Sequence, residues 1–178
     1  VSRGLGDVYK RQTVYVFNHS DRDLTDYLER LKKAIDKEDV KVVQCKAVEE
    51  LVRNSDIICT TTPSTTPVLP DDKELLRGKC IIAIGSYMPE MREIPDAVLD
   101  LVDNVYIELP YACEESGDLS QPLASGKLTK DRVKLMHEYL VSGEKEIKEG
   151  QTTYFKSVGM GLFDVCIAQK LYEVAKEK

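Results

Sequence analysis

Residues 56–64 read DIICTTTPS and residues 79–89 read KCIIAIGSYMP. In both stretches a short apolar run ends in small or hydroxyl-bearing residues and a proline. Continuous apolar runs of this length are typical of strands buried on both faces of a parallel sheet. We therefore expect two buried strands, each followed by a loop at the edge where α/β sheets bind ligands.

Runs prone to β-structure on both sides of these two stretches alternate with segments of helical periodicity. Residues rich in β-branched and aromatic side chains predict further strands at 13–17, 40–43, 104–108 and 152–155. Apolar residues at helical spacing predict helices at 24–35, at 47–52 with an end near Asn54, at 130–140 and from Gly161 onward. This alternation predicts an α/β fold with a Rossmann-like, doubly wound and mostly parallel sheet.

The connections between these elements are predicted from their polar residues. Residues 18–21 supply a turn and the cap of the first helix. Residues 114–119 resemble the end of a helix followed by a loop, and residues 143–150 a charged, exposed loop. The apolar positions of the terminal helix cover more than one narrow stripe, which predicts that it packs against more than its own sheet.

The composition of the 178 residues predicts a soluble globular domain. Apolar residues make up 42% and charged residues 31%, and no apolar run approaches the roughly 20 residues that span a bilayer. The net charge of −6 and the pI of 5.1 argue against a nucleic-acid partner, because binding a phosphate backbone needs a surplus of cations. Five scattered cysteines and two histidines form no metal-ligand or disulfide pattern, so we expect no metal and a reducing cytoplasmic location.

The first twelve residues do not continue this pattern. Residues 2–12, SRGLGDVYKRQ, resemble a translated transposon adapter that contaminates sequencing libraries, so residues 1–12 are excluded from the fold prediction. A native, flexible N-terminus is the alternative. Gly4 and Gly6 do not form a dinucleotide fingerprint, which requires a preceding strand, a third glycine and a following helix.

The loop after the first predicted strand bears on cofactor choice. NAD-preferring Rossmann enzymes place a carboxylate there to bind the ribose 2′-hydroxyl. Here Asn18, His19 and Ser20 occupy the loop and would not repel a 2′-phosphate, which slightly favours NADP over NAD. These residues could also serve only as a helix cap. The loops at 60–64 and 85–89 are small enough to admit a ribose, yet each alone could be a plain connection.

The order of four stretches is more specific than any one of them. Residues 56–64, 84–94 (IGSYMPEMREI), 115–119 (ESGDL) and 155–159 (FKSVG) occur in sequence. Together they resemble the ornithine cyclodeaminase/mu-crystallin family, whose members show a closely similar series ATPS…GSYxPxxRE…GDL…FKSVG. The resemblance runs from about Thr13 to the C-terminus and implies a nicotinamide cofactor, NAD or NADP.

The resemblance also implies roles for individual loops. Asn18, His19 and Ser20 match the loop that holds the adenosine ribose or its phosphate, and Thr61, Thr62 and Pro63 match the loop under the pyrophosphate and nicotinamide ribose. Tyr87 and Met88 match positions beside the nicotinamide. Ser157, Val158 and Gly159 match a turn that closes over the same ring.

Tyr87 departs from the cyclodeaminase pattern, in which this position is an aspartate proposed to move protons on the substrate amine. A phenol is a poor base but can donate a proton to a substrate nitrogen. The tyrosine therefore favours reduction of a C=N bond over cyclising deamination. The alternative is that Tyr87 only packs against the nicotinamide ring or another domain.

Family members carry an N-terminal substrate and dimerisation domain, followed by a strand and a glycine-rich loop. Both would precede Thr13, so the resemblance implies a fragment that lacks the first β-α unit and the residues that clamp the substrate. It divides the chain into an adapter-derived segment at 1–12, a partial nucleotide-binding domain at 13–157 and, at 158–178, a helix that packs on the missing domain.

The predicted parent is a cytoplasmic, homodimeric oxidoreductase that acts on a small amino or imino acid, such as Δ1-pyrroline-2-carboxylate or alanine. The alternatives are an ornithine cyclodeaminase, which releases proline and ammonia, and a mu-crystallin-like protein that binds NADPH without turnover.

Overall fold

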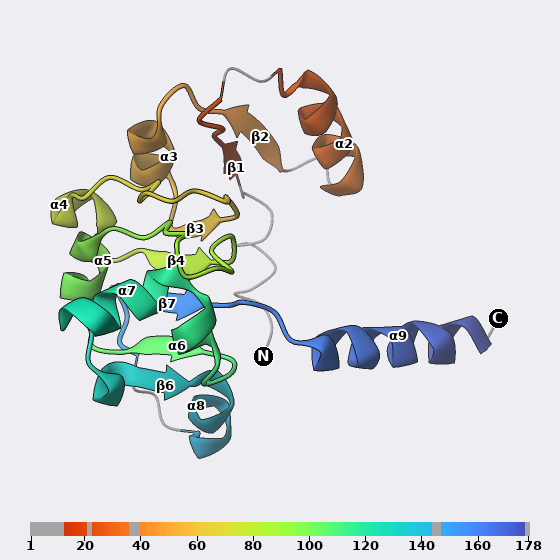
Figure 1. Cartoon of the computed structure of the whole chain (residues 1–178). Coiled ribbons are helices and arrows are strands. Elements are labelled where there is room, and N and C mark those ends of the chain that lie inside the picture. The colour runs from red at the N-terminus through yellow and green to blue at the C-terminus, as the bar shows by residue number, and fades with distance from the viewer. Residues whose placement is uncertain (1–12, 21–22, 36–39, 144–146, 177–178) are drawn as a thin grey trace. The chain divides into compact units, whose positions relative to one another are not determined.

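A computed structural model describes residues 13–20, 23–35, 40–143 and 147–176 (Figure 1). The chain forms two compact units, an N-terminal unit of residues 1–55 and a C-terminal unit of residues 56–178. Each unit is described by itself.

The N-terminal unit contains a two-stranded parallel sheet. Strand β1 (Thr13–Val16) pairs with β2 (Lys41–Gln44), and helix α2 (Thr25–Ile35) lies between them in the chain. Helix α3 (Val48–Asn54) follows β2 and buries Val52 completely. These elements confirm the strands and helices predicted for this part of the sequence.

The cap of α2 differs from the prediction. The Asp23 carboxylate accepts hydrogen bonds from the N–H of Thr25 at 2.9 Å and from its hydroxyl at 2.6 Å. Asn18 and Ser20 instead bond to each other, from Asn18 Nδ2 to Ser20 Oγ at 3.0 Å. The helix begins too far along the chain for residues 18–20 to cap it, while Asp21 lies outside the described residues.

The C-terminal unit is built on a five-stranded sheet in which every neighbouring pair is parallel. In spatial order its strands are β3 (Ile57–Thr60), β4 (Cys80–Ala83), β7 (Thr153–Lys156), β5 (Val105–Ile107) and β6 (Val133–Leu135). Strand β7, the last in the chain, therefore lies between β4 and β5 (Figure 1). The predicted α/β fold with a mostly parallel sheet is confirmed.

Short helices connect these strands. They are α4 (Lys73–Leu76), α5 (Asp96–Leu101), α6 (Ala112–Glu115), α7 (Gly117–Ser125) and α8 (Met136–Ser142). The core between helices and sheet is apolar and includes the fully buried side chains of Leu76, Ile81, Val98, Val105, Leu119 and Tyr154.

Two predicted elements of the second half were wrong. Residues 130–140 form a 3₁₀ turn (Lys130–Arg132), strand β6 and the start of α8 instead of one helix. Val133 pairs with Val105 of β5, so strand pairing overrides the local helical periodicity. The predicted helix end is found at Glu115, where α6 ends. The predicted loop is instead the start of α7, whose cap Ser116 accepts a hydrogen bond at Oγ from the N–H of Asp118.

Strand β3 is not buried on both faces as predicted. Ile58 and Thr60 are buried, whereas Ile57 is 65% exposed and Cys59 is exposed. Side chains of a strand alternate between its two faces, so one face of β3 is covered and the other is not.

Helix α9 (Gly161–Lys176) confirms the predicted terminal helix. None of its residues is buried, and its exposed apolar side chains are Leu162, Phe163, Val165, Ile167, Leu171, Tyr172 and Val174. No helix in the described ranges is long and apolar enough to cross a membrane.

Candidate functional site

The carboxyl ends of β3, β4 and β7 lie at one edge of the five-stranded sheet, because these neighbouring strands are parallel. The loop after β3 holds the predicted residues Thr61, Thr62 and Pro63, the loop after β4 holds Tyr87 and Met88, and the turn after β7 holds Ser157, Val158 and Gly159. Ligands of doubly wound sheets bind beyond this edge. Three of the four predicted groups are therefore brought to one place.

The fourth predicted group lies in the other unit. Asn18, His19 and Ser20 follow β1 at the carboxyl end of the two-stranded sheet, and all three are exposed. They occupy the equivalent position of their own sheet.

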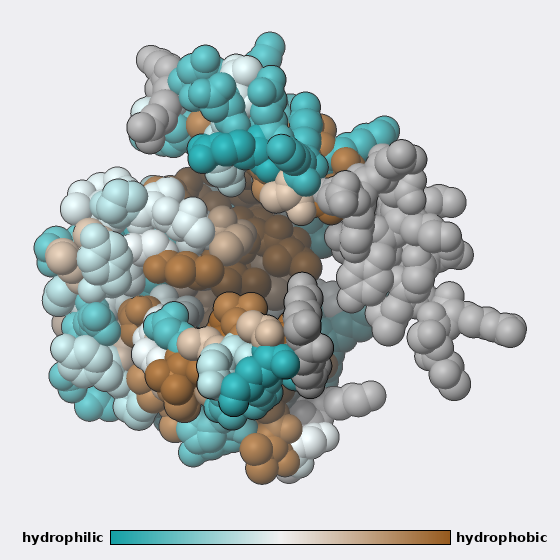
Figure 2. Space-filling model, turned by 90° about the vertical axis from the view of Figure 1, so that its right-hand side faces the viewer, coloured by the Kyte–Doolittle hydropathy of each residue, from teal (hydrophilic) through white to brown (hydrophobic). Residues whose placement is uncertain are grey.

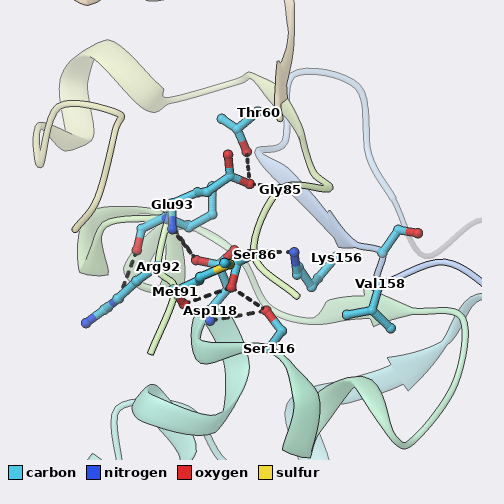
Figure 3. Close-up of polar contacts among 12 residues, drawn as sticks. Thr60, Gly85, Ser86, Met91, Arg92, Glu93, Ser116, Asp118, Lys156 and Val158 are labelled. Atoms are coloured by element: carbon cyan, nitrogen blue, oxygen red, sulfur yellow. Dashed lines mark hydrogen bonds and ion pairs between the residues drawn. The ribbon is translucent and has the colours of Figure 1, made fainter. Parts of the chain in front are cut away.

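A buried carboxylate joins the loops after β3 and β4. Glu93 is 0% exposed, and its Oε1 accepts hydrogen bonds from the Thr62 N–H at 2.5 Å and the Thr62 hydroxyl at 2.8 Å. Its Oε2 accepts from the Thr60 hydroxyl at 2.9 Å and the Gly85 N–H at 2.8 Å (Figure 3). Each oxygen thus binds one backbone N–H and one hydroxyl.

A second carboxylate fixes the backbone around Glu93. Asp118 Oδ1, at the start of α7, accepts from the N–H groups of Glu93 at 2.7 Å and Ile94 at 2.9 Å. Asp118 Oδ2 lies 3.5 Å from Lys156 Nζ at the end of β7 (Figure 3). Both side chains of this ion pair are fully buried. The pair connects α7 with the strand that precedes the Ser157–Gly159 turn.

Two serines link the same loops. Ser86 Oγ lies 2.9 Å from Ser116 Oγ and donates to the Met91 carbonyl at 2.8 Å. The N–H of Gly117 donates to the Met88 carbonyl at 3.0 Å. The loop after β4 is therefore attached to the N-terminus of α7.

A third carboxylate holds the turn after β7. Glu108 follows β5 and is 7% exposed. Its Oε1 accepts from the Ser157 hydroxyl at 2.8 Å, the Val158 N–H at 2.6 Å and the Gly159 N–H at 2.8 Å. Its Oε2 is buried without a hydrogen-bond partner. Gly159 has φ of 84°, a conformation that favours glycine.

The loops also approach too closely to admit side chains at two glycines. A Cβ at Gly85 would lie 2.2 Å from both the N and the O of Thr62. A Cβ at Gly117 would lie 2.1 Å from the Met91 carbonyl oxygen. The glycines of the GSY and GDL motifs are therefore required by backbone contact.

Burial controls the titration of the inner groups. Desolvation raises the pKa of the Asp118 carboxyl, although the Ile94 N–H and Lys156 oppose the shift. Desolvation lowers the pKa of the Lys156 amine, with Asp118 and Glu93 opposing it. Burial also raises the pKa of the Tyr154 hydroxyl, beside the same carboxylates. All three side chains are enclosed by the protein.

The exposed side of the loops differs in character from this charged interior. Figure 2 looks onto the side at which the strands of the five-stranded sheet end, where apolar side chains lie beside polar ones. Tyr87 is 47% exposed and Met88 is 41% exposed. An accessible phenol beside an apolar thioether suits contact with a flat heterocycle. Within the described part of the chain, no group of three or more His, Cys, Asp or Glu side chains could hold a metal ion.

Glu93, Asp118 and Lys156 lie within the sequence motifs and Glu108 lies in the predicted strand 104–108, but the sequence pattern assigned none of them a role. One signal was available. Glu108 directly follows the apolar and aromatic strand β5, and Lys156 ends β7 after two aromatic residues, positions where a charged residue is unusual.

Comparison with known proteins places this site in a family. The family model described as "Ornithine cyclodeaminase/mu-crystallin family" matches residues 7–178. The chain is 37% identical over 136 residues to a Delta(1)-pyrroline-2-carboxylate reductase from Bacillus cereus, covering 75% of this chain and 41% of that protein. It is 34% identical over 135 residues to the ketimine reductase mu-crystallin of Rattus norvegicus, covering 76% of this chain and 40% of that protein.

A solved structure shows the same fold. The Delta(1)-pyrroline-2-carboxylate reductase of Thermococcus litoralis, in complex with NADH and L-proline, superposes with a TM-score of 0.80 at 20% identity, covering 93% of this chain and 51% of that one. The chain thus spans about half the length of the relatives it matches. On its sequence motifs, its fold and this match, the chain belongs to the ornithine cyclodeaminase/mu-crystallin family.

Proposed function

We propose that this chain forms the nucleotide-binding part of an NAD(P)-dependent oxidoreductase that acts on a small amino or imino acid, of the pyrroline-2-carboxylate reductase or alanine dehydrogenase type. One observation carries the proposal. The buried carboxylates of Glu93 and Glu108 bind backbone N–H groups in the loops after β3, β4 and β7. In the same loops Thr61, Tyr87 and Met88 remain exposed at the sheet edge. Relatives named as reductases support the reaction class.

The residues of the three loops have separate roles in this proposal. Thr61, Thr62 and Pro63 lie under the pyrophosphate and nicotinamide ribose, and Ser157, Val158 and Gly159 close over the ring. The nicotinamide supplies or accepts the hydride. Tyr87 and Met88 lie beside it, and the phenol of Tyr87 donates a proton to the substrate nitrogen.

We further propose that NADP binds at least as well as NAD. Asn18, His19 and Ser20 provide an amide, an imidazole and a hydroxyl but no carboxylate at the carboxyl end of β1. Without that negative charge a 2′-phosphate is not repelled.

The whole protein is proposed to be a cytoplasmic homodimer. The exposed apolar residues of α9, within 158–178, suit burial against a domain other than the nucleotide-binding part at 13–157.

The test uses the protein encoded by the complete reading frame that contains this sequence. We expect NADPH- or NADH-dependent reduction of Δ1-pyrroline-2-carboxylate or amination of pyruvate. Release of ammonia and proline from ornithine would instead make the protein a cyclodeaminase. Tight NADPH binding without turnover of any of these substrates would contradict the enzyme proposal and favour a crystallin-like binding protein.

A further inference from the structure

Glu93 binds one backbone N–H group in each of two loops, through a different carboxylate oxygen for each. Oε1 binds Thr62 in the loop after β3, whereas Oε2 binds Gly85 in the loop after β4 as well as the Thr60 hydroxyl. Backbone N–H groups cannot rotate to find another partner as hydroxyls can. The distance between the two loops therefore depends on both oxygens being acceptors.

Glu93 lies near the end of the loop after β4 and is itself held in place. Its own N–H is held by Asp118 at 2.7 Å, and its side chain is fully buried. Asp118 is in turn held by Lys156 of β7, whose Nζ lies 3.5 Å from Asp118 Oδ2. The contact between Gly85 and Thr62 leaves no room for a Cβ, so the two loops cannot move closer.

Glu108 provides a contrasting case in the same sheet edge. It is also buried, and it also holds a cofactor loop, but all three of its hydrogen bonds go to Oε1. Its Oε2 has no hydrogen-bond partner. One oxygen is sufficient for this turn, whereas the loops joined by Glu93 require two.

We propose that Glu93 is a positioning residue for the cofactor: its two oxygens, each binding the backbone N–H of a different loop, set the separation of the loops after β3 and β4 that the dinucleotide binds. This inference rests on the proposed function for the identity of the ligand. The division of hydrogen bonds, by contrast, is a property of the chain alone.

The experiment compares Glu93→Gln with Glu74→Gln, a surface substitution in α4, in the protein from the complete reading frame. A glutamine at position 93 leaves either Thr62 or Gly85 facing an amide NH₂, so one backbone N–H loses its acceptor. A glutamine at position 74 removes the same charge from an exposed side chain and takes no acceptor from a backbone N–H group. The same substitution should therefore affect the two loops only at position 93.

Two readouts separate positioning from general stability. The first is amide hydrogen exchange without cofactor, where Glu93→Gln should accelerate exchange at Thr62 or Gly85 and leave the β4 amides unchanged. The second is cofactor affinity, from fluorescence titration with NADPH and NADH at a temperature well below the melting temperature. We expect Glu93→Gln to raise the Kd and the cofactor KM by about tenfold to a hundredfold, the scale of a small displacement at a binding site. The kcat at saturating cofactor should change less, and the surface control Glu74→Gln should leave the Kd and the KM within about threefold.

The two proposals fail differently. If the parent binds cofactor and Glu93→Gln weakens binding no more than Glu74→Gln does, the positioning role of Glu93 is wrong while the proposed function stands. If the parent binds neither cofactor, the proposed function is wrong, and the exchange data decide the inference by themselves. Unchanged exchange at both Thr62 and Gly85 in Glu93→Gln would overturn it.

Discussion

Four charged side chains lie buried beneath the candidate site, and their pairing explains why the fold tolerates them. Glu93, Glu108 and Asp118 together accept hydrogen bonds from six backbone N–H groups, while Lys156 pairs with Asp118. An isolated buried charge costs several kcal/mol, and a buried pair rarely adds net stability. Their effect here is on geometry, because each carboxylate fixes loop backbone that lies far away in sequence.

Tyr87 provides the first test at this scale. If its phenol donates the proton during C=N reduction, Tyr87→Phe in the protein from the complete reading frame should lower kcat by roughly a hundredfold or more. Cofactor affinity should hardly change, because the ring remains. A kcat within a few-fold of the parent, with chemistry rate-limiting, would assign the proton to another donor.

Asn18 tests the cofactor preference. Asn18→Asp places a carboxylate at the carboxyl end of β1, where it would repel a 2′-phosphate. We expect the ratio of the NADPH Kd to the NADH Kd to rise by about tenfold or more, the scale of like-charge repulsion. Fluorescence titration with both cofactors measures it. A parent protein that already binds NADH more than tenfold better than NADPH would show that this loop is misinterpreted.

Gly85 tests the close approach of the two loops. Gly85→Ala forces a Cβ to within 2.2 Å of the Thr62 backbone, so the loops must separate. We expect a loss of about 1–3 kcal/mol in the free energy of unfolding, the usual cost of overpacking, together with weaker cofactor binding. Gly161→Ala is the matched control, since a Cβ there meets nothing within 4 Å and no positive φ is present. Equal stability of the two variants in urea unfolding would contradict this account.

At the scale of elements, one acidic residue joins two helices and a loop. Asp100 of α5 accepts from Lys73 of α4 at 2.7 Å and from Lys127, just after α7, at 2.6 Å. Hydrogen bonds from Lys127 and then Lys73 lower the pKa of Asp100 below its ordinary 3.8. Asp100 in turn raises the pKa of Lys127 above its ordinary 10.5.

The signs of these shifts define a pH window. Asp100 contributes to the stability of the folded chain above pH 3.8, and this contribution is lost as the pH falls through its lowered folded pKa. Lys127 contributes to stability below pH 10.5, and this contribution is lost as the pH rises through its raised folded pKa. Asp100→Asn should lower the urea midpoint at pH 7 by about 0.2–0.5 M, since the groups are largely exposed, and have no effect near pH 2. Glu74→Gln, which breaks only the exposed pair with Arg77, is the control. A loss that persists at the lower pH would assign the effect to packing.

At the scale of the whole molecule, the prediction concerns how much chain the reaction needs. The relatives are about twice as long as this chain. We expect the 178 residues expressed alone to show no turnover, because positioning a substrate and its cofactor requires binding energy from both sides of the reacting atoms. Steady-state assays beside the protein from the complete reading frame measure this. Turnover above background by the 178 residues would show that the chemistry has been assigned to the wrong part of the protein.

The sequence by itself determined the α/β class, the parallel strands before residue 110 and the order of motifs that marks the family. These features are local, because apolar runs of strand length and helical spacing arise from neighbouring residues. The positions of Thr61, Tyr87 and Ser157 in loops at the sheet edge followed from the same local pattern.

The tertiary structure alone decided what depends on distant partners. Strand β7 lies between β4 and β5, and residues 133–135 form a strand because β5 offers them a pairing edge. Glu93 looks like an ordinary surface carboxylate in the sequence, since the N–H groups that it binds lie 8 and 31 positions away. Glu108 is unusual beside an apolar strand, but nothing near it in the sequence indicates its partners 50 and 51 positions away. Local propensity carries no information on such long-range hydrogen bonds, so the residues that shape the site became visible only in the folded chain.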